Sequence, residues 1–412
     1  MNGKVKIFTS LFSALALLTV SAGCSKEGAP SLDWKYPKEE TVAHIEVPPE
    51  GAGDRFNITY GEWYSEYSYN MLMGGYTEES HSDVAQKYRQ NIIDYLVREK
   101  IFLYLAEQAG ITYDTLTEEE KSTIDKNVQD NWNYYCTSYA TDAANALGSV
   151  YTKEELYDKE FELFTEFMAK AGLTPDIFVT WEVSDMIWDK LLENISKGIS
   201  DDEVNEYFQS VVDDAKEMYE NDLAAFESSA YTSFYIPEGT RTVQQLCVRI
   251  DADDADEIRA YRKDGDDEKA DELLNKALEV VRFRIDEAYE KLQSGEDWAE
   301  VQKEYSDDNS GIGVDYTVYP TSTVVAQEFT DAAMGIEEKG GISEIIVNDA
   351  GFFILCYIDD RAFSDEELKE LLSQAREFLT EDELYNRISD FKEKYPYVYH
   401  YDILELPEPV DK

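Results

Sequence analysis

The pattern of helix-start signals constrains the fold of this chain more than any other feature. Between residues 55 and 230 the sequence contains capping boxes, in which Ser or Thr precedes Glu by three positions and satisfies the first backbone N–H groups of a helix. These boxes begin at Thr59, Thr117, Thr152 and Ser200. The pattern predicts helices over about residues 83–109, 118–145, 153–171, 175–197 and 201–228. This part of the chain is therefore expected to be almost entirely helical.

A different pattern begins near residue 237. Pro237–Gly239 interrupts the helical signals, and Arg241–Ile250 has the composition of a strand. Residues 251–272 are mostly acidic and are expected to form a solvated loop, whereas residues 273–294 have the pattern of an amphipathic helix. Short strands and turns follow, so this region is predicted to be an α+β unit. Helical signals return after Ser364.

Two short strand-like segments flank the helical regions, at Val42–Val47 and Tyr397–Leu406. If they pair, the helices near both ends of the chain form one lobe, and the α+β unit is an insertion within it. The predicted fold class is therefore α+β multidomain, with a mostly helical lobe and an inserted α+β domain. The predicted segments are a leader at 1–23, a tether at 24–52, a helical domain at 53–236, an α+β domain at 237–362 and a C-terminal segment at 363–412 that completes the helical lobe.

The first 24 residues have the pattern of a secretory signal. Lys4 and Lys6 precede an apolar run that is too short for a membrane-spanning helix, and Ser-Ala-Gly-Cys24 follows it. This ending resembles a bacterial lipobox, which implies cleavage before Cys24 and a lipid on its sulfur. An ordinary signal peptide or an uncleaved anchor is the alternative. We expect a lipid-anchored protein on the extracytoplasmic face of the cell membrane, held at a distance by the tether.

Composition excludes several functions. The net charge is −51, and loss of Lys4 and Lys6 with the leader would take it to −53. A surface this acidic repels nucleic acid and anionic lipid headgroups, so neither is an expected partner. The sequence does not decide whether the chain forms a homodimer.

Few residues in this chain are of the types that form a structural zinc site. It has three histidines and four cysteines, and the cysteines show no C-x-x-C spacing, so neither a metal nor a cofactor is expected. Cys247 and Cys356 both fall in predicted strands of the α+β unit. A disulfide between them is an alternative, but buried free thiols are favoured.

The order of motifs in the first helical region resembles that of PrsA/SurA-type foldases. The motifs are Ile58–Tyr64, Arg89–Lys100, Ala106–Ile111 and Thr117–Glu120, between the lipobox and the α+β unit. The resemblance implies a helical lobe that binds client polypeptides. Tyr and Trp are frequent here and could line a groove for unfolded chain, but we expect most of them to lie in the core.

The α+β region resembles a parvulin (PpiC-type) prolyl isomerase domain. The motifs that carry this resemblance are Leu292–Ala299, Tyr305–Ser310, Gln327–Ala333, Gly341–Val347 and Gly351–Leu355. A prolyl isomerase lowers a barrier of about 20 kcal/mol to rotation about an X–Pro bond. It needs an apolar cup for the proline ring and groups that stabilise the twisted amide, without a covalent step.

The resemblance assigns residues to this site. The cup positions are Tyr316, Val325 and Phe329, with Tyr319 nearby. The acidic or thiol position of the family falls on Asp308. The two family histidines fall on Gln245, which can still form hydrogen bonds, and on Phe353, which cannot. These replacements predict reduced catalysis or none.

The expected function is a membrane-anchored extracytoplasmic foldase or chaperone that binds unfolded exported polypeptides. The first alternative is an active peptidyl-prolyl cis-trans isomerase with a variant site. The second is a lipoprotein without chaperone activity that binds within an envelope complex.

Overall fold

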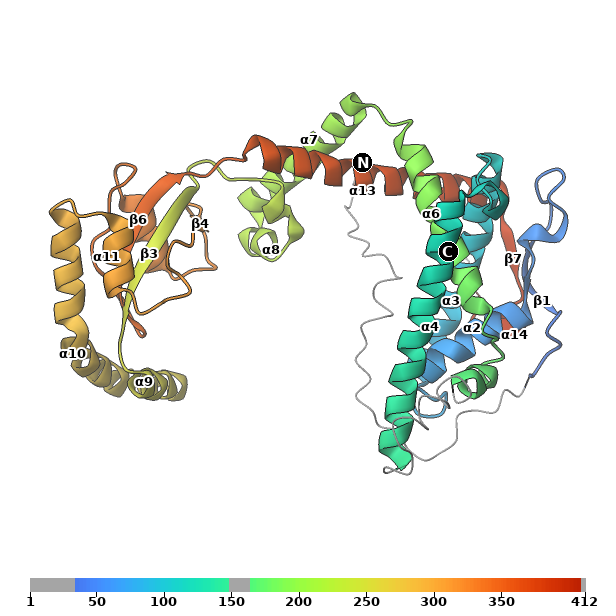
Figure 1. Ribbon diagram of the computed structural model, residues 1–412, viewed down its shortest axis with the longest axis horizontal. Coiled ribbons are helices and arrows are strands. Elements are labelled where there is room, and N and C mark those ends of the chain that lie inside the picture. Colours follow the sequence, from blue (N-terminus) through green and yellow to red (C-terminus); the bar gives the residue numbers. More distant parts are fainter. Residues whose placement is uncertain (1–33, 148–163, 409–412) are drawn as a thin grey trace. The chain divides into compact units, whose positions relative to one another are not determined.

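The computed structural model describes residues 34–147 and 164–408 of the 412 (Figure 1). The chain forms two compact units. The helical unit contains the residues up to Ser200 together with those from Arg376 onward, and the second unit contains Asp201–Ala375. Helices α7 (Asp201–Asn221) and α8 (Leu223–Glu227) thus belong to the second unit, although the sequence pattern assigned them to the helical domain.

Helices make up most of the helical unit. Its described elements are β1 (Thr41–Ile45), β2 (Ile58–Thr59), α2 (Tyr60–Met73), α3 (Ser82–Gln108), α4 (Glu118–Leu147), α6 (Ile177–Ser196), most of α13 (Asp365–Lys394), β7 (Tyr397–Tyr399) and α14 (Tyr401–Leu404). The capping box at the start of α2 is formed, because Thr59 accepts a hydrogen bond from the Glu62 backbone and Glu62 accepts one from the Thr59 backbone. The local signals therefore place this helix start correctly.

A small antiparallel sheet joins the two ends of the helical unit. Its strand order is β2-β1-β7, and Ala43 lies opposite Tyr399 while Ile45 lies opposite Tyr397. The predicted pairing of the terminal strands is confirmed, and so is the predicted fold class, in which a helical lobe carries an inserted α+β unit. Strand β7 is shorter than the predicted segment Tyr397–Leu406, because the chain turns into α14 at Tyr401 and buries Leu404 in the core.

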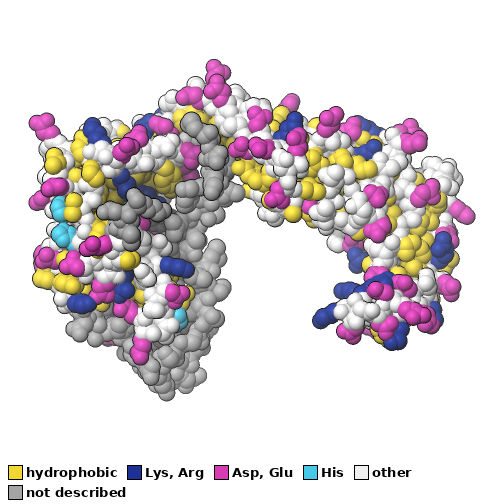
Figure 2. Space-filling view, turned by 180° about the vertical axis from the view of Figure 1, so that it is seen from behind, with side chains coloured by type: hydrophobic (Ala, Val, Ile, Leu, Met, Phe, Trp, Pro, Cys, Tyr) yellow, Lys and Arg dark blue, Asp and Glu magenta, His cyan; other side chains and the backbone are white. Residues whose placement is uncertain are grey.

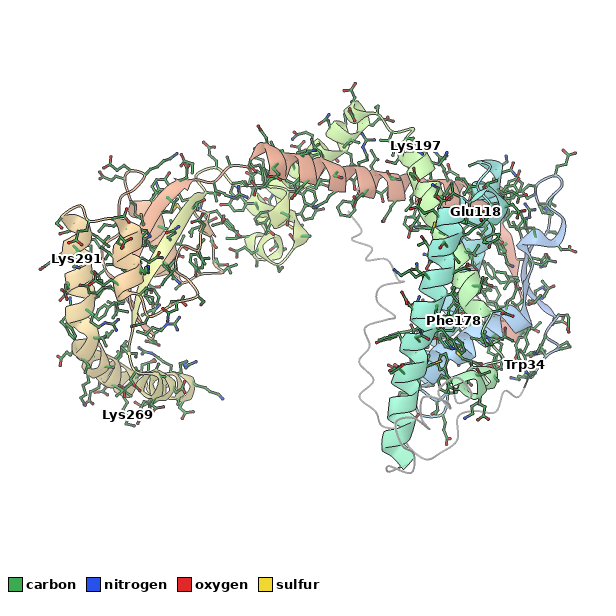
Figure 3. All side chains as sticks on the ribbon, viewed as in Figure 1. Trp34, Glu118, Phe178, Lys197, Lys269 and Lys291 are labelled. Carbon is green, nitrogen blue, oxygen red and sulfur yellow. The ribbon has the colours of Figure 1, made fainter. Side chains whose placement is uncertain are left out.

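The core of the helical unit lies between α2, α3, α6 and the end of α13. Ile93, Ile101, Leu191 and Leu384 are among its buried aliphatic residues. Tyr60 and Trp63 are buried with them, and Tyr67 and Tyr69 are buried in neighbouring clusters. A second cluster lies between α4 and α6, where the ring of Phe178 is 5.5 Å from that of Trp132 (Figure 3). For these residues the interpretation as core is confirmed.

The second unit is built around a four-stranded antiparallel sheet in the order β4-β3-β6-β5. Its elements are α7 (Asp201–Asn221), α8 (Leu223–Glu227), β3 (Arg241–Arg249), α9 (Ala252–Asp264), α10 (Asp267–Gln293), α11 (Trp298–Tyr305), β4 (Tyr316–Val318), α12 (Gln327–Gly335), β5 (Ile346–Asn348), β6 (Gly351–Asp360) and the start of α13. Gly351 has a φ of +140°, and a Cβ there would lie 2.2 Å from the Val248 carbonyl oxygen. Only glycine therefore allows the β5–β6 turn to approach β3 this closely.

The acidic segment 251–272 is helical, so the predicted solvated loop is wrong. It forms α9 and the beginning of α10, separated by Gly265 in the left-handed conformation. Arg262 accounts for the difference, because its guanidinium binds Asp267, Asp271 and Asp349 together. One cation thus ties the acidic helices to the β5–β6 turn and offsets their mutual repulsion.

The two faces of the sheet have different neighbours. Leu246, Val248, Phe352 and Ile354 pack beneath α10 and α11 (Figure 1). The other face carries Val243, Leu355 and Tyr357, which pack with α12. Cys247 and Cys356 are buried free thiols, as predicted. Among the described residues, none of the helices combines the length and apolar character that crossing a membrane requires.

Candidate functional site

The candidate site lies on the sheet face opposite α10 and α11. Side chains alternate between faces along a strand, so Gln245 and Cys247 of β3 share this face. Antiparallel pairing places Leu355 opposite Gln245 and Phe353 opposite Cys247. Gln245 and Phe353 therefore lie on the same face of adjacent strands, with Phe353 two residues from the partner of Gln245.

A polar cluster joins three of the predicted site residues. The Gln245 side-chain amide donates to Oδ2 of Asp308 at 3.3 Å and to the hydroxyl of Tyr316 at 3.2 Å. Asp308 lies in the turn after α11, and Tyr316 begins β4. The glutamine thus connects β3, the turn after α11 and β4 through its hydrogen bonds.

Short hydrogen bonds fix the turn that carries Asp308. The Asp307 backbone donates to the Cys247 carbonyl at 2.7 Å, and Ser310 Oγ donates to Asp308 Oδ1 at 2.8 Å. Arg249 lies 3.5 Å from the same Asp308 oxygen. The neighbouring Asp307 binds the Arg284 guanidinium; burial raises the pKa of Asp307, but hydrogen bonds from Arg284 outweigh it and leave that pKa below its usual value.

Two residues that the sequence reasoning missed hold this turn against β3. Gln302 of α11 is fully buried, and its amide group donates to the carbonyl oxygen of Gln245 at 2.8 Å while its oxygen accepts from the Gly313 backbone at 3.1 Å. Gly311 leaves space for the cluster, since a Cβ there would lie 2.7 Å from Asp308 Oδ2 and 3.2 Å from the Tyr316 hydroxyl. A signal existed for Gln302, which follows Trp298 by four positions on the apolar face of its helix.

The apolar part of the site lies beside this cluster. Tyr316 and Phe329 are both half-buried and pack against the group formed by Val243, Val318 and Ala333. Val325 is half-buried in the loop before α12. The cup predicted from Tyr316 and Phe329 therefore has apolar walls on this face of the sheet.

Tyr319 does not join this group. Its ring lies 5.8 Å from that of Tyr219 in α7 and 6.0 Å from that of Phe226 in α8. Tyr319 directly follows the last residue of β4, where the chain has left the sheet. The side chain of Tyr319 instead supports the loop between β4 and α12.

Phe353 changes the chemistry of the site. It is half-buried and lies opposite Cys247, and its ring offers no donor or acceptor. Burial raises the pKa of Cys247 to about 11, so this thiol is neutral at physiological pH and a poor nucleophile. The arrangement places apolar side chains beside the hydrogen-bond donor of Gln245, and it is not suited to covalent catalysis.

The parts of the chain that the structure describes contain no group of three or more His, Cys, Asp or Glu side chains that could hold a metal ion. Cys24 lies outside the described residues.

The candidate site is made of Gln245, Asp308, Tyr316 and Phe329, with Phe353 at its edge and Gln302 as support.

Comparison with known proteins identifies the fold around this site. Residues 268–359 match the rotamase family described as the PPIC-type PPIASE domain. The chain contains a parvulin-type domain. The match includes Asp308, Tyr316, Phe329 and Phe353, while Gln245 lies before its first residue on the strand paired with β6. The matched region includes Phe353, to which the resemblance assigns the position of a family histidine.

Solved structures of three PrsA proteins are similar to most of the chain. PrsA from Bacillus subtilis is 16% identical, with 87% of this chain and 93% of that chain covered and a TM-score of 0.21. The foldase protein PrsA from Streptococcus pneumoniae is 15% identical, with 88% and 97% covered and a TM-score of 0.30. The peptidylprolyl isomerase PrsA from Bacillus cereus is 15% identical, with 87% and 95% covered and a TM-score of 0.22. No curated protein is significantly similar to the chain in sequence.

Proposed function

We propose that this protein is an extracytoplasmic foldase of the PrsA type, whose parvulin domain binds unfolded exported polypeptides and catalyses proline isomerisation weakly or not at all. The observation that carries this proposal is the polar cluster of the site. Gln245 joins Asp308 and Tyr316 beside an apolar cup, while Phe353 stands at the second histidine position. Binding of a proline-containing segment would need the cup, and the apolar packing around Tyr316 and Phe329 supports this part of the proposal.

Catalysis needs more than binding. An isomerase is efficient only where its contacts are stronger with the twisted amide than with the planar one. Gln245 can donate a hydrogen bond, but its amide is already engaged with two acceptors. The phenyl ring of Phe353 can stabilise neither state by hydrogen bonding. We therefore propose that the site mainly binds polypeptide and contributes little to catalysis.

The leader supports the proposed location. The sequence before Cys24 has the pattern of a lipoprotein signal, and the helical unit carries the motifs that resemble the client-binding lobe of PrsA/SurA-type foldases. Lipid on Cys24 would hold the protein at the membrane surface where exported chains emerge. Metabolic labelling with an alkyne fatty acid tests this location, because Cys24→Ser should abolish the label.

Isomerase turnover on a proline-containing peptide tests the parvulin domain. We expect the natural chain to give little turnover above the uncatalysed rate. Replacing both positions, Gln245→His with Phe353→His, should raise turnover by about tenfold or more if the missing imidazoles limit the reaction. Vigorous turnover by the natural chain would instead support the alternative of an active isomerase with a variant site.

Suppression of aggregation tests the foldase function. The full chain should slow aggregation of a reduced, unfolded client, and Phe329→Ala should weaken this effect if the cup contributes to client binding. Phe283→Ala is the matched control, because Phe283 lies on α10 and is 66% exposed. If the full chain leaves client aggregation unchanged, the second alternative is favoured, which is a binding lipoprotein without chaperone activity.

A further inference from the structure

Two surface grooves lie outside the parvulin site, within the second unit. The first groove has a volume of about 410 Å³ and is bordered by α8, β4 and the start of α13. Its apolar lining includes Phe226, Tyr235, Ile236, Tyr319, Phe363 and Leu371. The second groove has a volume of about 440 Å³ and lies beside α7, with Phe208, Val212, Phe234 and Leu368 in its lining. Neither lining contains Gln245, Asp308 or Phe329.

The two grooves share a wall. Tyr235, Ile236, Pro237, Thr240, Arg361 and Phe363 line both of them. These residues belong to the two chain segments that connect the helices to the sheet, and the Arg361 backbone donates to the Thr240 carbonyl at 2.9 Å. Figure 2 shows hydrophobic side chains gathered over the part of this unit that holds α8 and the start of α13. The shared wall thus separates two adjacent apolar hollows.

Apolar and aromatic side chains dominate these linings, and they are partly exposed. Phe208, Tyr235, Ile236 and Phe363 are each half-buried. Beneath them, Val211, Phe234 and Leu371 form a buried cluster that supports the groove floor. Partly exposed aromatic rings over a fixed apolar base are favourable anchor points for apolar side chains, because Tyr and Phe give large contact area with little loss of entropy.

The charge around the grooves selects the partner. The linings contain the acids Glu238, Asp360, Glu367 and Glu370, and Arg361 is their one basic residue. The Arg361 guanidinium is already bound to Glu367. Glu238 and Glu370 are exposed, and no ion pair engages either of them in the described structure. The free charge at these grooves is therefore negative, which favours a partner with basic residues and repels an acidic one.

We propose that the two grooves form a second polypeptide-binding site, which holds an extended apolar segment with basic flanking residues and does not require proline. An extended chain presents alternate side chains to one surface at about 6.6 Å intervals, so two of them can enter adjacent hollows. This inference rests on the proposed foldase function and adds to it a second site with its own ligand chemistry. The Lys or Arg residues of the ligand would meet Glu238 and Glu370.

Fluorescence anisotropy with the full chain tests this site. The probe is a fluorescein-labelled, proline-free peptide with alternating Phe and Leu and with Lys at both ends, so it gives the parvulin cup no proline. Phe363→Ser should raise its Kd by about tenfold, as expected for loss of a central apolar anchor. Phe283→Ser is the matched control on α10 and should leave the Kd unchanged.

Charge reversal provides a test that does not disturb packing. Glu238→Lys with Glu370→Lys should weaken binding of the Lys-flanked peptide and strengthen binding of the same peptide with Glu at its ends. Circular dichroism melting confirms that each variant is folded. Glu238 and Glu370 are exposed, so we expect their replacement to leave the fold unchanged. The double variant therefore tests the site even if Phe363→Ser lowers stability.

The outcomes separate this inference from the proposed function. If Phe329→Ala abolishes binding of the proline-free peptide while both groove variants bind normally, the parvulin cup is the only site and the second site is refuted. Absence of peptide binding by the natural chain also refutes it, and aggregation suppression then shows independently whether the foldase function stands.

Discussion

At the residue scale, the helical unit places several carboxyl groups away from water. Glu66 of α2 accepts a hydrogen bond from the Trp181 indole at 3.1 Å, and burial raises its pKa to about 7, with Glu99 nearby adding repulsion. Burial also raises the pKa of Asp185 in α6 to about 7 and that of Glu99 in α3 above its usual value. Glu99 accepts from Ser184 Oγ at 2.7 Å. These acids lie between three helices that pack together.

The raised pKa values predict that the helical unit is most stable at mildly acidic pH. Between about pH 4.5 and 7 the folded unit binds protons that the unfolded chain has lost, so stability falls as pH rises through this range. Glu66→Gln should stabilise the unit by about 1–3 kcal/mol at pH 8 and change little at pH 4. Thermal unfolding measured across this range checks the prediction.

Glu62 is the matched control on the same helix. Burial raises its pKa, but Lys100 and Thr59 outweigh this effect and leave the pKa below its usual value. Glu62→Gln should therefore lower the melting temperature at neutral pH and matter less in acid, which is the opposite sign. Parallel pH profiles for the two variants would show that burial of Glu66 is not the cause.

At the element scale, α8 holds the loop that leads to the parvulin cup. Glu227, its last residue, accepts from the Thr323 backbone at 2.7 Å, from Ser322 Oγ at 3.0 Å and from the Thr323 hydroxyl. Burial raises the Glu227 pKa, but these hydrogen bonds outweigh it and leave the pKa below its usual value. Tyr319 packs on the same helices. Helices outside the parvulin match thus position the segment before α12.

Loss of this carboxylate should loosen the loop. Glu227→Gln retains one acceptor oxygen but loses the charge, which is worth about 1.5–3 kcal/mol for hydrogen bonds to an ionised group. We expect hydrogen exchange in residues 319–325 to become at least about tenfold faster, while exchange in β3 is unchanged. Glu220→Gln on α7 is the control, since Glu220 is exposed and lies 3.9 Å from Lys216. Unchanged protection of the loop would show that Tyr319 packing alone holds it.

At the scale of the whole molecule, the helical unit is closed by residues from both ends of the chain. Strand β7 pairs with β1, and Ile403, Leu404 and Leu406 behind it are buried. The second unit has its own sheet and its own core. Folding of the helical unit therefore depends on residues that follow the inserted unit by sequence.

Truncation tests this dependence. Removal of residues 397–412 should destabilise the helical unit by more than about 5 kcal/mol, because it exposes several core side chains and leaves β1 without a partner on one edge. The second unit should be unaffected. Amide exchange in β1 and β3 distinguishes the two units, and a chain ending at Pro407 is the control. Equal loss of protection in both strands would contradict independent cores.

The sequence by itself predicted the starts of α2 and α4, the pairing of the terminal strands and a parvulin-like domain, whereas the start predicted at Thr152 lies outside the described residues. Capping boxes act within four residues, and the spacing of the parvulin motifs is set by short turns, so both can be recognised along the chain. The resemblance to parvulins also implied that Gln245, Asp308 and Tyr316 share one site, and the structure brings them into contact.

Only the tertiary structure decided which side chains complete that site and which leave it. Tyr319 packs against α7 and α8, and Gln302 is buried beneath the site. Glu227 accepts a hydrogen bond from the backbone of Thr323, which lies 96 positions later in the sequence. Arg262 joins the helices of residues 251–272 to Asp349 in the β5–β6 turn. These contacts join residues far apart in the chain, and their energies come from burial and charge pairing that arise only once the elements have packed.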